Sequence, residues 1–415
     1  MAEKKPYSEA VRTGHYAKKS GLTGKYDNVR RSWEDEVTRL FIRPFLKKLV
    51  DNKARKLERL RIMDLGCGNG DGYDLIMGIT SKDVGIYEYS VDIINQEILG
   101  RYLGIDINTD LLREAEEFHS GNQKIMFRQS DFSAGLSLEE DPFDIYLTSY
   151  GTLSHNNDSQ NAKILSDIAR HCGDHALIIC DWLGRYSYEW QELWLQNPEE
   201  ETFMDYRISY IYPPEERETV DIKSFPLRLL SQDEAIRIVK QASADSGVDI
   251  KVKKFFDRSI FVGRHMDTAE YNRHCPAMRE VVNALLEPNI RTDLSSLIID
   301  YIPKTGYTDL NRFFENYSMY WNSLVKHTMA FLSEFHGESP ATPDLPDSHL
   351  AYPESLRNSI NTMKNIINAT GNLPGDSRAN IIEPQLAYSL RRLEMDMQQG
   401  IGVGHGFVGI LEINK

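Results

Sequence analysis

The feature that most constrains the fold is a glycine-rich stretch that follows a short apolar run, RIMDLGCGNGD at residues 61–71. The apolar residues predict a buried strand, and the glycines at positions 66, 68 and 70 lead from it into a predicted helix. Glycine lets the backbone turn sharply and, because it has no Cβ, allows a ligand to approach the main chain. A glycine triplet alone also fits an ordinary structural turn, so the residues that follow it decide between the two interpretations.

A second apolar run, YLGIDIN at residues 102–108, ends in an acidic side chain. A carboxylate at a strand end after a glycine loop is placed to accept hydrogen bonds from ribose hydroxyls. That acid usually follows the glycines by about 20 residues, a spacing that favours Glu88 over Asp106. We nevertheless prefer Asp106, because its strand continues into a helix that Asn108 or Thr109 can cap. Residues 80–101 are then an insertion.

Two further strand-like runs follow, MFRQSDF and FDIYLTSYG, and both end in polar residues. In this order, DLGCGNG, GIDIN, SDF and FDIYLTSYG resemble the successive motifs of class I S-adenosylmethionine-dependent methyltransferases, over about residues 55–265. Hydride-transferring Rossmann enzymes normally carry G-x-G-x-x-G, whereas the spacing here is G-x-G-x-G after Asp64. The resemblance implies an α/β fold, a Rossmann-like sheet with helices on both faces, and S-adenosylmethionine as cofactor.

The resemblance also implies a set of cofactor contacts. Asp131 is expected to hydrogen-bond the adenine amino group, and Phe132 to donate its backbone N–H or to pack on the ring. Ligands of open α/β sheets sit beyond the carboxyl ends of the strands, so the end of the fourth strand is expected to face the transferable methyl group. An amino-terminal arm is expected to close over the cofactor, although it also fits a merely surface-packed segment. The cofactor-binding residues are predicted to be Tyr16, Tyr26, Arg30, Asp64, Gly66, Gly68, Gly70, Asp106, Asn108, Asp131, Phe132, Ser149 and Tyr150.

Methyl transfer from a sulfonium is an in-line displacement, for which a protein mainly supplies alignment and a dry site. An oxygen or nitrogen nucleophile that carries a proton needs a base near neutrality. His155, just beyond the fourth strand, is the first candidate, and Asp181, at the end of the fifth strand, is the second. A histidine at such a junction also fits a capping or hydrogen-bonding role. No Asn-Pro-Pro-aromatic sequence follows the fourth strand, which disfavours the amino-methylating DNA and protein-glutamine branches.

The chain is predicted to have three parts: an arm and helix at 1–54, the methyltransferase domain at 55–265, and a mostly helical addition at 266–415. Within the domain, residues 183–230 are rich in aromatics and are expected to form a lid over the acceptor, or simply to pack on the core. The runs IKVKKFF and RSIFVGR are expected to complete the sheet as an antiparallel hairpin. The addition ends in a predicted strand, GHGFVGILEINK, and is expected to form a wall of the acceptor site, a homodimer interface or both.

The charge and the apolar runs of the sequence limit which partners and which location are expected. Residues 1–60 carry 16 Lys and Arg against 8 Asp and Glu, a local charge of +8, which leaves −22 for the rest. An acidic body disfavours nucleic acid as substrate, since phosphate attraction normally needs a basic face. The basic end fits either attraction of an anionic acceptor or a solvated helix face. No run approaches the roughly 20 apolar residues of a membrane span, and the start lacks a signal-peptide pattern, so a cytoplasmic location is expected.

The four cysteines lie far apart without metal-ligand spacing, which predicts reduced thiols and no metal site. Together these features predict a methyltransferase that acts on a small-molecule acceptor at oxygen, nitrogen or carbon. Two alternatives stay open: methylation of a protein or carrier-bound intermediate, and a cofactor-binding partner protein without turnover of its own.

Overall fold

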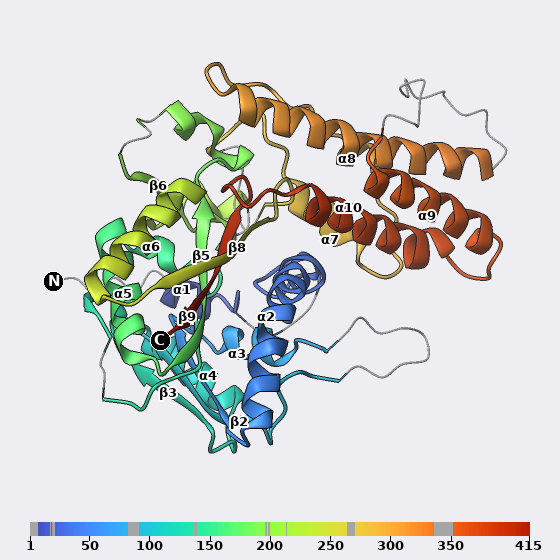
Figure 1. Cartoon of the computed structure of the whole chain (residues 1–415). Coiled ribbons are helices and arrows are strands. Elements are labelled where there is room, and N and C mark those ends of the chain that lie inside the picture. Colours follow the sequence, from blue (N-terminus) through green and yellow to red (C-terminus); the bar gives the residue numbers. More distant parts are fainter. Residues whose placement is uncertain are drawn as a thin grey trace.

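A computed structural model of the chain describes residues 7–16, 18, 21–81, 91–136, 139–195, 197, 200–212, 214–263, 270–335 and 352–415. A nine-stranded sheet lies at its centre (Figure 1). The strands are β1 (Leu60–Leu65), β2 (Leu99–Asp106), β3 (Ile125–Gln129), β4 (Ile145–Leu147), β5 (His175–Gly184), β6 (Thr202–Arg207), β7 (Ser224–Leu230), β8 (Ile250–Arg258) and β9 (Gly406–Asn414).

The first five strands are parallel and lie in the order β3-β2-β1-β4-β5. Beyond β5 the sheet divides. β9 pairs antiparallel with β5 from His175 to Leu183, and β8 pairs antiparallel with β9. β7 pairs with only the last two residues of β5, and its other edge pairs antiparallel with β6. A parallel sheet that reverses its order at β1 and β4 opens a crevice at the carboxyl ends of these strands.

The predicted hairpin of residues 250–256 with 258–264 is wrong. The first run is part of β8, but its partner is β9 at the end of the chain, with Ile250 opposite Ile413 and Arg258 opposite Gly406. The strand predicted in GHGFVGILEINK is confirmed, and it is this strand that completes the sheet. The sheet therefore extends past the predicted boundary at residue 265, and the helical segment is inserted between β8 and β9.

The described part of the chain contains ten α-helices. They are α1 (Ser8–Arg12), α2 (Asp35–Arg55), α3 (Asp71–Met77), α4 (Thr109–Phe118), α5 (Asp158–His171), α6 (Gln232–Ser246), α7 (Met278–Leu285), α8 (Thr308–Phe335), α9 (Glu354–Thr370) and α10 (Glu383–Met397).

Alternation along the strands assigns each side chain to one of two cores. In β1, Leu60 and Ile62 belong to the core that includes α2, α3 and the carboxyl-terminal helices, whereas Met63 and Leu65 belong to the core with α5 and α6. Successive side chains of a strand point to opposite faces, so an apolar run predicts burial on both. The predicted Rossmann-like fold with helices on both faces is confirmed.

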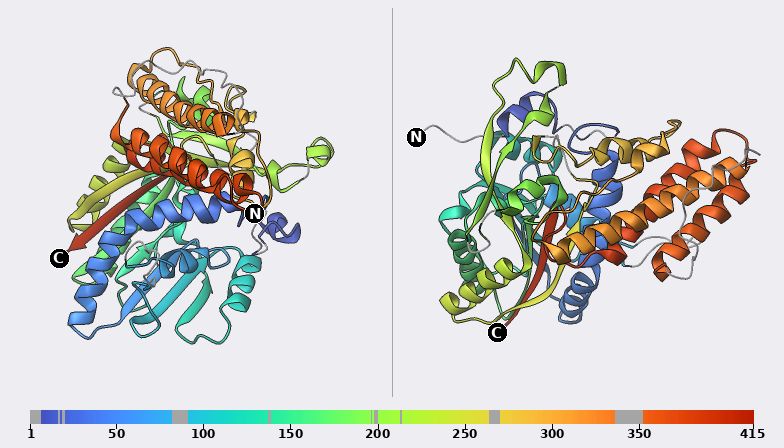
Figure 2. Two further views of the ribbon diagram at one scale, coloured as in Figure 1. Left: turned by 90° about the vertical axis from the view of Figure 1, so that its right-hand side faces the viewer. Right: turned by 90° about the horizontal axis from the view of Figure 1, so that it is seen from above.

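Helices α8, α9 and α10 lie beside one another and project away from the sheet (Figures 1 and 2). Their apolar residues are continuous with the core on one face of the sheet: Trp321 of α8 packs against Phe261 and Trp33, with ring centroids 6.1 Å apart in both pairs. The predicted helical addition is thus present and shares a core with the methyltransferase sheet.

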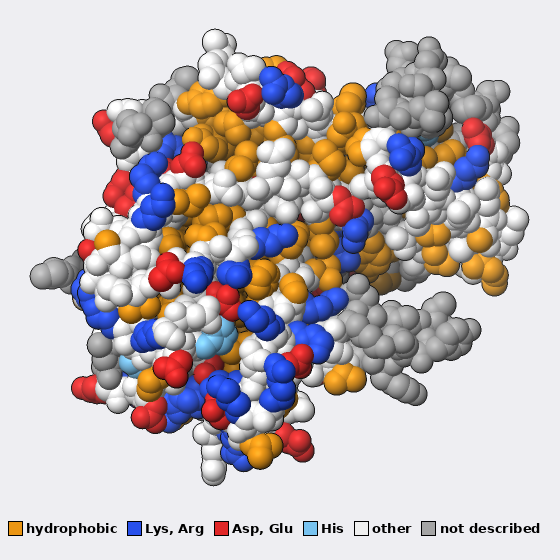
Figure 3. Space-filling view, viewed as in Figure 1, with side chains coloured by type: hydrophobic (Ala, Val, Ile, Leu, Met, Phe, Trp, Pro, Cys, Tyr) orange, Lys and Arg blue, Asp and Glu red, His pale blue; other side chains and the backbone are white. Residues whose placement is uncertain are grey.

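Lys and Arg side chains gather over α2 on the face shown in Figure 3. Several of them pair with acids: Lys47 with Asp51 at 2.9 Å, and Lys53 with Asp144 at 2.6 Å. Part of the positive charge of residues 1–60 is therefore matched locally on a solvated helix face.

Candidate active site

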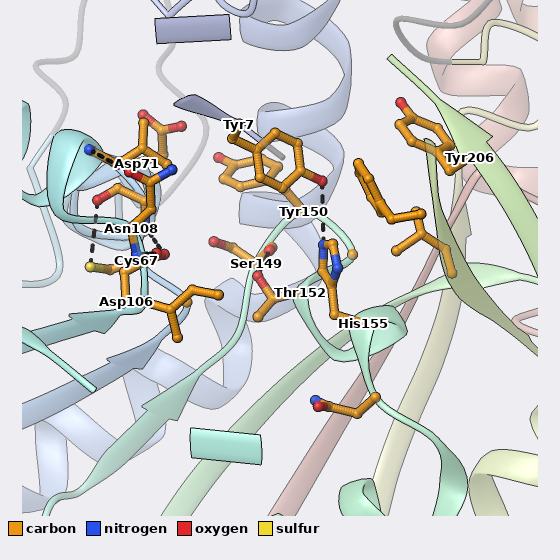
Figure 4. A pocket seen from close by; sticks show the side chains of 18 of the residues that line it. Tyr7, Cys67, Asp71, Asp106, Asn108, Ser149, Tyr150, Thr152, His155 and Tyr206 are labelled. Carbon is orange, nitrogen blue, oxygen red and sulfur yellow. Dashed lines mark hydrogen bonds between the residues drawn. The ribbon is translucent and has the colours of Figure 1, made fainter. Parts of the chain in front are cut away.

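A cavity of about 380 Å³ opens at the carboxyl ends of β1, β2 and β4. Figure 4 shows Asp71, Asp106 and Asn108 at one end, and His155 and Tyr206 at the other. Ten of the residues predicted for the site line this cavity: Tyr16, Gly66, Gly68, Asp106, Asn108, Asp131, Phe132, Ser149, Tyr150 and His155. The predicted residues Tyr26, Arg30, Asp64, Gly70 and Asp181 lie outside its described lining.

The glycine loop turns between β1 and α3 with left-handed backbone at Gly66 and Gly68, where φ is 69° and 55°. Such conformations are costly for residues with a Cβ. A Cβ on Gly66 would overlap Thr152, whereas a Cβ on Gly68 would make ordinary contacts with two cavity-lining side chains, 3.9 Å from Lys25 Nζ and 4.0 Å from Leu111 Cδ1. The loop therefore exposes its main chain to the cavity at Gly68, as the sequence predicted for a cofactor loop.

Asp106 ends β2 and joins the glycine loop to α4. Its Oδ2 accepts a hydrogen bond from Gly68 N at 2.9 Å, and its Oδ1 accepts one from Asn108 N at 2.8 Å. Burial raises the pKa of Asp106 above its ordinary value, against the lowering effect of these hydrogen bonds. Asn108 is the N-cap of α4, as predicted, and accepts from Asp110 N and Leu111 N. Glu88, the alternative acid, lies outside the described residues.

Asp131 and Phe132 follow β3 and line the cavity beyond Asp106. The carboxylate of Asp131 is exposed and accepts from Ser133 N at 2.9 Å, so it has lone pairs left for another donor. Phe132 is buried. Their positions are compatible with the predicted adenine contacts.

The residues after β4 form a tight turn at the centre of the cavity wall. Tyr150 has a left-handed backbone, with φ at 58°, which is uncommon for a residue with a Cβ. Tyr150 N donates to Asp181 Oδ2 at 2.8 Å, and Tyr150 Oη donates to Asp35 at 2.9 Å. The guanidinium of Arg30 lies 3.4 Å from the centre of the Tyr150 ring. These contacts hold the turn from behind.

Asp181 is buried and is one of the residues that hold the turn after β4 in place. Its Oδ2 accepts from Arg258 Nη2 at 2.7 Å as well as from Tyr150 N. Arg258 is itself buried and also donates to Thr38 Oγ1 at 2.8 Å. The carboxylate that the sequence offered as a second base is thus shared between a backbone N–H and a guanidinium, away from the described cavity lining.

The amino-terminal arm is anchored on Asp71, at the start of α3. Asp71 Oδ2 lies 2.5 Å from Lys25 Nζ and 3.4 Å from Arg30 Nη2, and Tyr26 Oη donates to Oδ1. Burial alone would raise the pKa of Asp71, but the two cations outweigh it and hold that pKa below its usual range. Tyr26 and Arg30 therefore fix the arm, while Tyr16 and Lys25 reach the cavity.

The two other predicted residues outside the lining support the loop. Asp64 is fully buried and accepts from Tyr102 Oη at 2.5 Å, and burial raises its pKa to about 8. Gly70 has φ at 91°, and a Cβ there would lie 2.8 Å from His119 Nε2. Both residues shape the glycine loop from the protein side.

The far end of the cavity is aromatic. His155 Nε2 is 3.3 Å from Tyr7 Oη, and the His155 ring stacks on Phe225 with centroids 5.4 Å apart. Desolvation lowers the pKa of His155 to about 4. The ring is nevertheless exposed to the open cavity, so water there lessens this shift, and an acceptor that displaces the water restores it. Tyr206, Tyr210 and Leu227 of the β6–β7 region complete this end.

Sequence reasoning missed several lining residues: Tyr7, His15, Lys25, Asp71, Thr152 and His405. Lys25 and Asp71 carry opposite charges 46 positions apart, and no local pattern links them. A sequence pattern could have drawn attention to His405. It stands in GIGVGHG, where every second residue is glycine, directly before the final strand.

The lining fits S-adenosylmethionine. Gly68 offers close main-chain approach, Asp106 offers a carboxylate for hydroxyl groups, and Lys25 offers a cation to a carboxylate. Within the described residues, no helix has the length and apolar character to cross a membrane. No group of three or more His, Cys, Asp or Glu in that same part of the chain could hold a metal ion.

Comparison with known proteins agrees with this site. Residues 88–174 match the model of a family described as a methyltransferase domain, a range that begins after the glycine loop and includes β2 to α5. No curated protein matches the sequence.

Solved structures resemble the chain weakly. An S-adenosylmethionine-dependent methyltransferase from Methanosarcina mazei is 16% identical over 48% of this chain and 84% of its own, with a TM-score of 0.33. One from Clostridium acetobutylicum is 13% identical over 52% and 83%, with a TM-score of 0.32. The amino pentose methyltransferase CalS10 from Micromonospora echinaspora is 10% identical over 51% and 84%, with a TM-score of 0.29.

The strand order, the glycine loop with Asp106, and the family match lead to one conclusion. The protein is an enzyme with a class I methyltransferase domain, and its cofactor is S-adenosylmethionine.

Proposed function

We propose that the enzyme methylates a small-molecule acceptor, which binds at the aromatic end of the cavity. The observation that carries the proposal is that one cavity joins the glycine loop to the aromatic end, lined by Tyr7, Tyr206 and Phe225. A concave, partly apolar cavity with a few polar groups is typical of small-molecule sites. When bound, S-adenosylmethionine supplies an activated methyl group, so the chain's main tasks are alignment and exclusion of water.

Three segments line the acceptor end of the cavity. The arm contributes Tyr7 and Tyr16, the turn after β4 contributes Ser149 to Thr152, and the β6–β7 hairpin contributes Tyr206 and Phe225. We propose that this hairpin is the acceptor lid predicted at residues 183–230. His155 contributes a polar ring nitrogen among these aromatics, and we propose that it hydrogen-bonds the acceptor near its nucleophilic atom.

The proposed cofactor contacts are predicted residues that line the cavity. Asp106 would hold the ribose, and Asp131 and Phe132 would hold the adenine. Gly68 would let the cofactor approach the main chain. We assign Asp64, Gly70, Tyr26, Arg30 and Asp181 to the support of these groups, since their hydrogen bonds and packing contacts are with protein atoms. A cytoplasmic location, homodimerisation and inactivity on nucleic acids stay predictions.

The test is a methyl-transfer screen with labelled cofactor against pools of metabolites, RNA and proteins. We expect label in one class of small molecules and none in RNA or protein. The control is a Gly68→Val variant, which should label nothing. Label in a protein or carrier-bound substrate alone would replace the small-molecule proposal. Cofactor binding without transfer to any pool would instead favour a partner protein without turnover.

A further inference from the structure

We propose that His405 is the catalytic base of this site, and that Glu189 is the positioning residue that orients it. The proposal deepens the proposed function and rests on it: the acceptor would carry a proton on the oxygen or nitrogen that is methylated. His405 comes from the last residues of the inserted helical segment, far in the sequence from every motif that identifies the methyltransferase domain.

Glu189 and His405 form a close, buried pair. His405 Nδ1 lies 2.6 Å from Glu189 Oε2, and both side chains are buried, with exposed fractions of 3% and 1%. The Trp190 ring meets the imidazole edge-on, with centroids 5.3 Å apart. Glu189 Oε1 has no hydrogen-bond partner among the described residues. A buried carboxylate whose one hydrogen bond is to a histidine acts chiefly on that histidine.

The carboxylate of Glu189 fixes the tautomer of the His405 imidazole. A carboxylate accepts hydrogen bonds and cannot donate them, so Nδ1 carries the hydrogen and Nε2 keeps its lone pair. His405 lines the cavity, and no described group hydrogen-bonds its Nε2. A carboxylate that holds the ring and stabilises the imidazolium, with the second ring nitrogen toward the reacting atom, is the arrangement of a histidine base with its orienting acid.

Backbone hydrogen bonds and close packing hold the loop that presents His405. Asp257 Oδ1 accepts hydrogen bonds from Gly402 N and Val403 N at 2.9 Å each, and Oδ2 accepts from Ile401 N at 3.0 Å. A Cβ on Gly402 would lie 2.7 Å from the carbonyl oxygen of Leu230, so only glycine allows this close packing. Cβ atoms on Gly400 and Gly404 would likewise overlap the carbonyl oxygens of Phe255 and Arg258, so close backbone packing accounts for the glycines at these positions.

The backbone of His405 is fixed as well. Gly184 N at the end of β5 donates to the His405 carbonyl at 3.2 Å, and His405 N donates to the Ser259 carbonyl at 3.1 Å. The ring thus stands at the carboxyl end of β5, next to Leu183, which also lines the cavity. This end of the sheet neighbours the turn after β4, where the methyl group is expected.

Comparison with His155 favours His405 as the base. His155 has Tyr7 Oη near its Nε2 and Phe225 against its ring, but no carboxylate is paired with it in the described residues. An imidazolium formed there would lack a counter-charge, whereas one formed at His405 would lie beside Glu189. His155 suits a neutral hydrogen-bonding role, and His405 suits proton transfer.

The proposed step couples proton transfer to His405 with methyl transfer to the acceptor. His405 Nε2 takes the proton from the acceptor's O–H or N–H group, and the electron pair released there forms the new bond to the methyl carbon. The carbon–sulfur bond breaks with its pair on sulfur, which becomes an uncharged thioether. The imidazolium, paired with Glu189, then returns its proton to water as the product leaves.

Other charged groups also face this histidine. Arg258 lies against its neighbour, since a Cβ on Gly406 would be 2.6 Å from Arg258 Nε, and Arg258 is paired with Asp181 at 2.7 Å. Asp257 binds the backbone of the preceding loop. Glu189 is the one carboxylate in the described residues that contacts the imidazole ring, so the pH dependence of the base is assigned to that pair.

The first experiment is a pH–rate profile on the acceptor found in the screen, whether metabolite or macromolecule. His405→Gln should lower kcat about 100-fold or more, a loss within the range known for general bases. It should also remove the acid limb of the profile, which is the fall in rate at low pH. Glu189→Gln should lower kcat about tenfold and move the acid limb to lower pH, and Glu189→Asp should restore part of both. S-adenosylhomocysteine affinity should change less than twofold in each variant, which shows that the fold is kept.

Matched controls separate the base from other histidines. His175→Gln, at the opposite end of the same β5–β9 pair and 3.8 Å from Glu412, should leave kcat and the profile unchanged. His155→Gln should lower kcat but keep the acid limb. An acid limb that survives in a folded, cofactor-binding His405→Gln variant would overturn the proposal, and loss of the limb in His155→Gln instead would assign the base to His155.

A second measurement needs no acceptor. In NMR spectra of ¹⁵N-histidine-labelled protein, the ring nitrogen shifts of neutral His405 should show the hydrogen on Nδ1, and Glu189→Gln should weaken this tautomer preference, because an amide can donate as well as accept. A tautomer that is the same in wild type and Glu189→Gln would overturn the pairing even if the screen succeeds. A screen that labels no small molecule would reject the proposed acceptor class and leave this measurement to judge the pair by itself.

Discussion

Asp181 Oδ2 accepts hydrogen bonds from Tyr150 N at 2.8 Å and from Arg258 Nη2 at 2.7 Å. One carboxylate oxygen thus connects the left-handed turn after β4 to the end of β8. The turn carries Ser149 and Thr152 into the cavity, while Asp181 itself stays behind it. The strand-end position that made Asp181 look like a base explains instead how the turn is held.

Asp181→Asn tests this role. The amide keeps an oxygen for Tyr150 N but loses the charge that pairs with buried Arg258, so the variant should be less stable by about 3 kcal/mol. Urea unfolding measures that loss. The acid limb of the pH–rate profile should stay where it is in the wild type. A limb that disappears in folded Asp181→Asn would show that Asp181 is the base.

Gly68→Val should abolish binding of S-adenosylmethionine and leave the protein folded. The valine side chain would enter the cavity, and its Cβ would also strain a backbone with φ at 55°. Calorimetry with S-adenosylhomocysteine measures the affinity. Gly121→Val is the matched control, because Gly121 is also left-handed, with φ at 91°, and has open space around it. Equal affinity in wild type and folded Gly68→Val would reject the loop as the cofactor site.

Asp106→Ala should weaken cofactor binding at least tenfold, since a hydrogen bond to a charged group contributes roughly 1.5–3 kcal/mol. The variant also removes the acceptor of Gly68 N, which adds disorder to the loop. Isothermal titration of Asp106→Ala and Glu88→Ala decides between the two acids. A tenfold loss in Glu88→Ala, with Asp106→Ala unaffected, would assign the ribose to the other carboxylate.

Glu394 on α10 predicts a pH dependence of stability. Burial raises its pKa to about 7, although Trp33 Nε1, Ser259 N and Ile260 N donate to it. Between pH 4.5 and 7 the unfolded chain has this group ionised while the folded chain keeps it protonated. The folded state then binds more protons, so stability falls as pH rises through this window, by up to about 3 kcal/mol, and levels off above pH 7.

Glu394→Gln should remove this part of the slope. The measurement is the free energy of unfolding in urea at pH 5 and pH 7.5, compared within each protein, because the amide also changes the local hydrogen bonds. Equal differences between the two pH values in wild type and variant would show that Glu394 ionises with an ordinary pKa.

Local patterns were enough to predict much of this enzyme. The apolar run before Gly66 predicted β1, the apolar run that ends at Asp106 predicted β2, and Asn108 predicted the start of α4. Each of these signals lies within about ten residues, where side-chain alternation, capping and glycine geometry act directly on the backbone. The cofactor loop and the parallel sheet follow from such signals.

The amino-acid sequence by itself therefore determined the methyltransferase fold and the glycine loop with Asp106 at one end of the cavity. Only the tertiary structure decided which strand follows β5, which groups anchor the arm, and which histidine has a carboxylate partner. β9 pairs with β8 across more than 140 residues, and Glu189 lies 216 positions from His405. Such pairs are selected by burial and charge in the folded chain, where an unpaired buried ion is costly, and nothing in the local sequence of either residue records its partner.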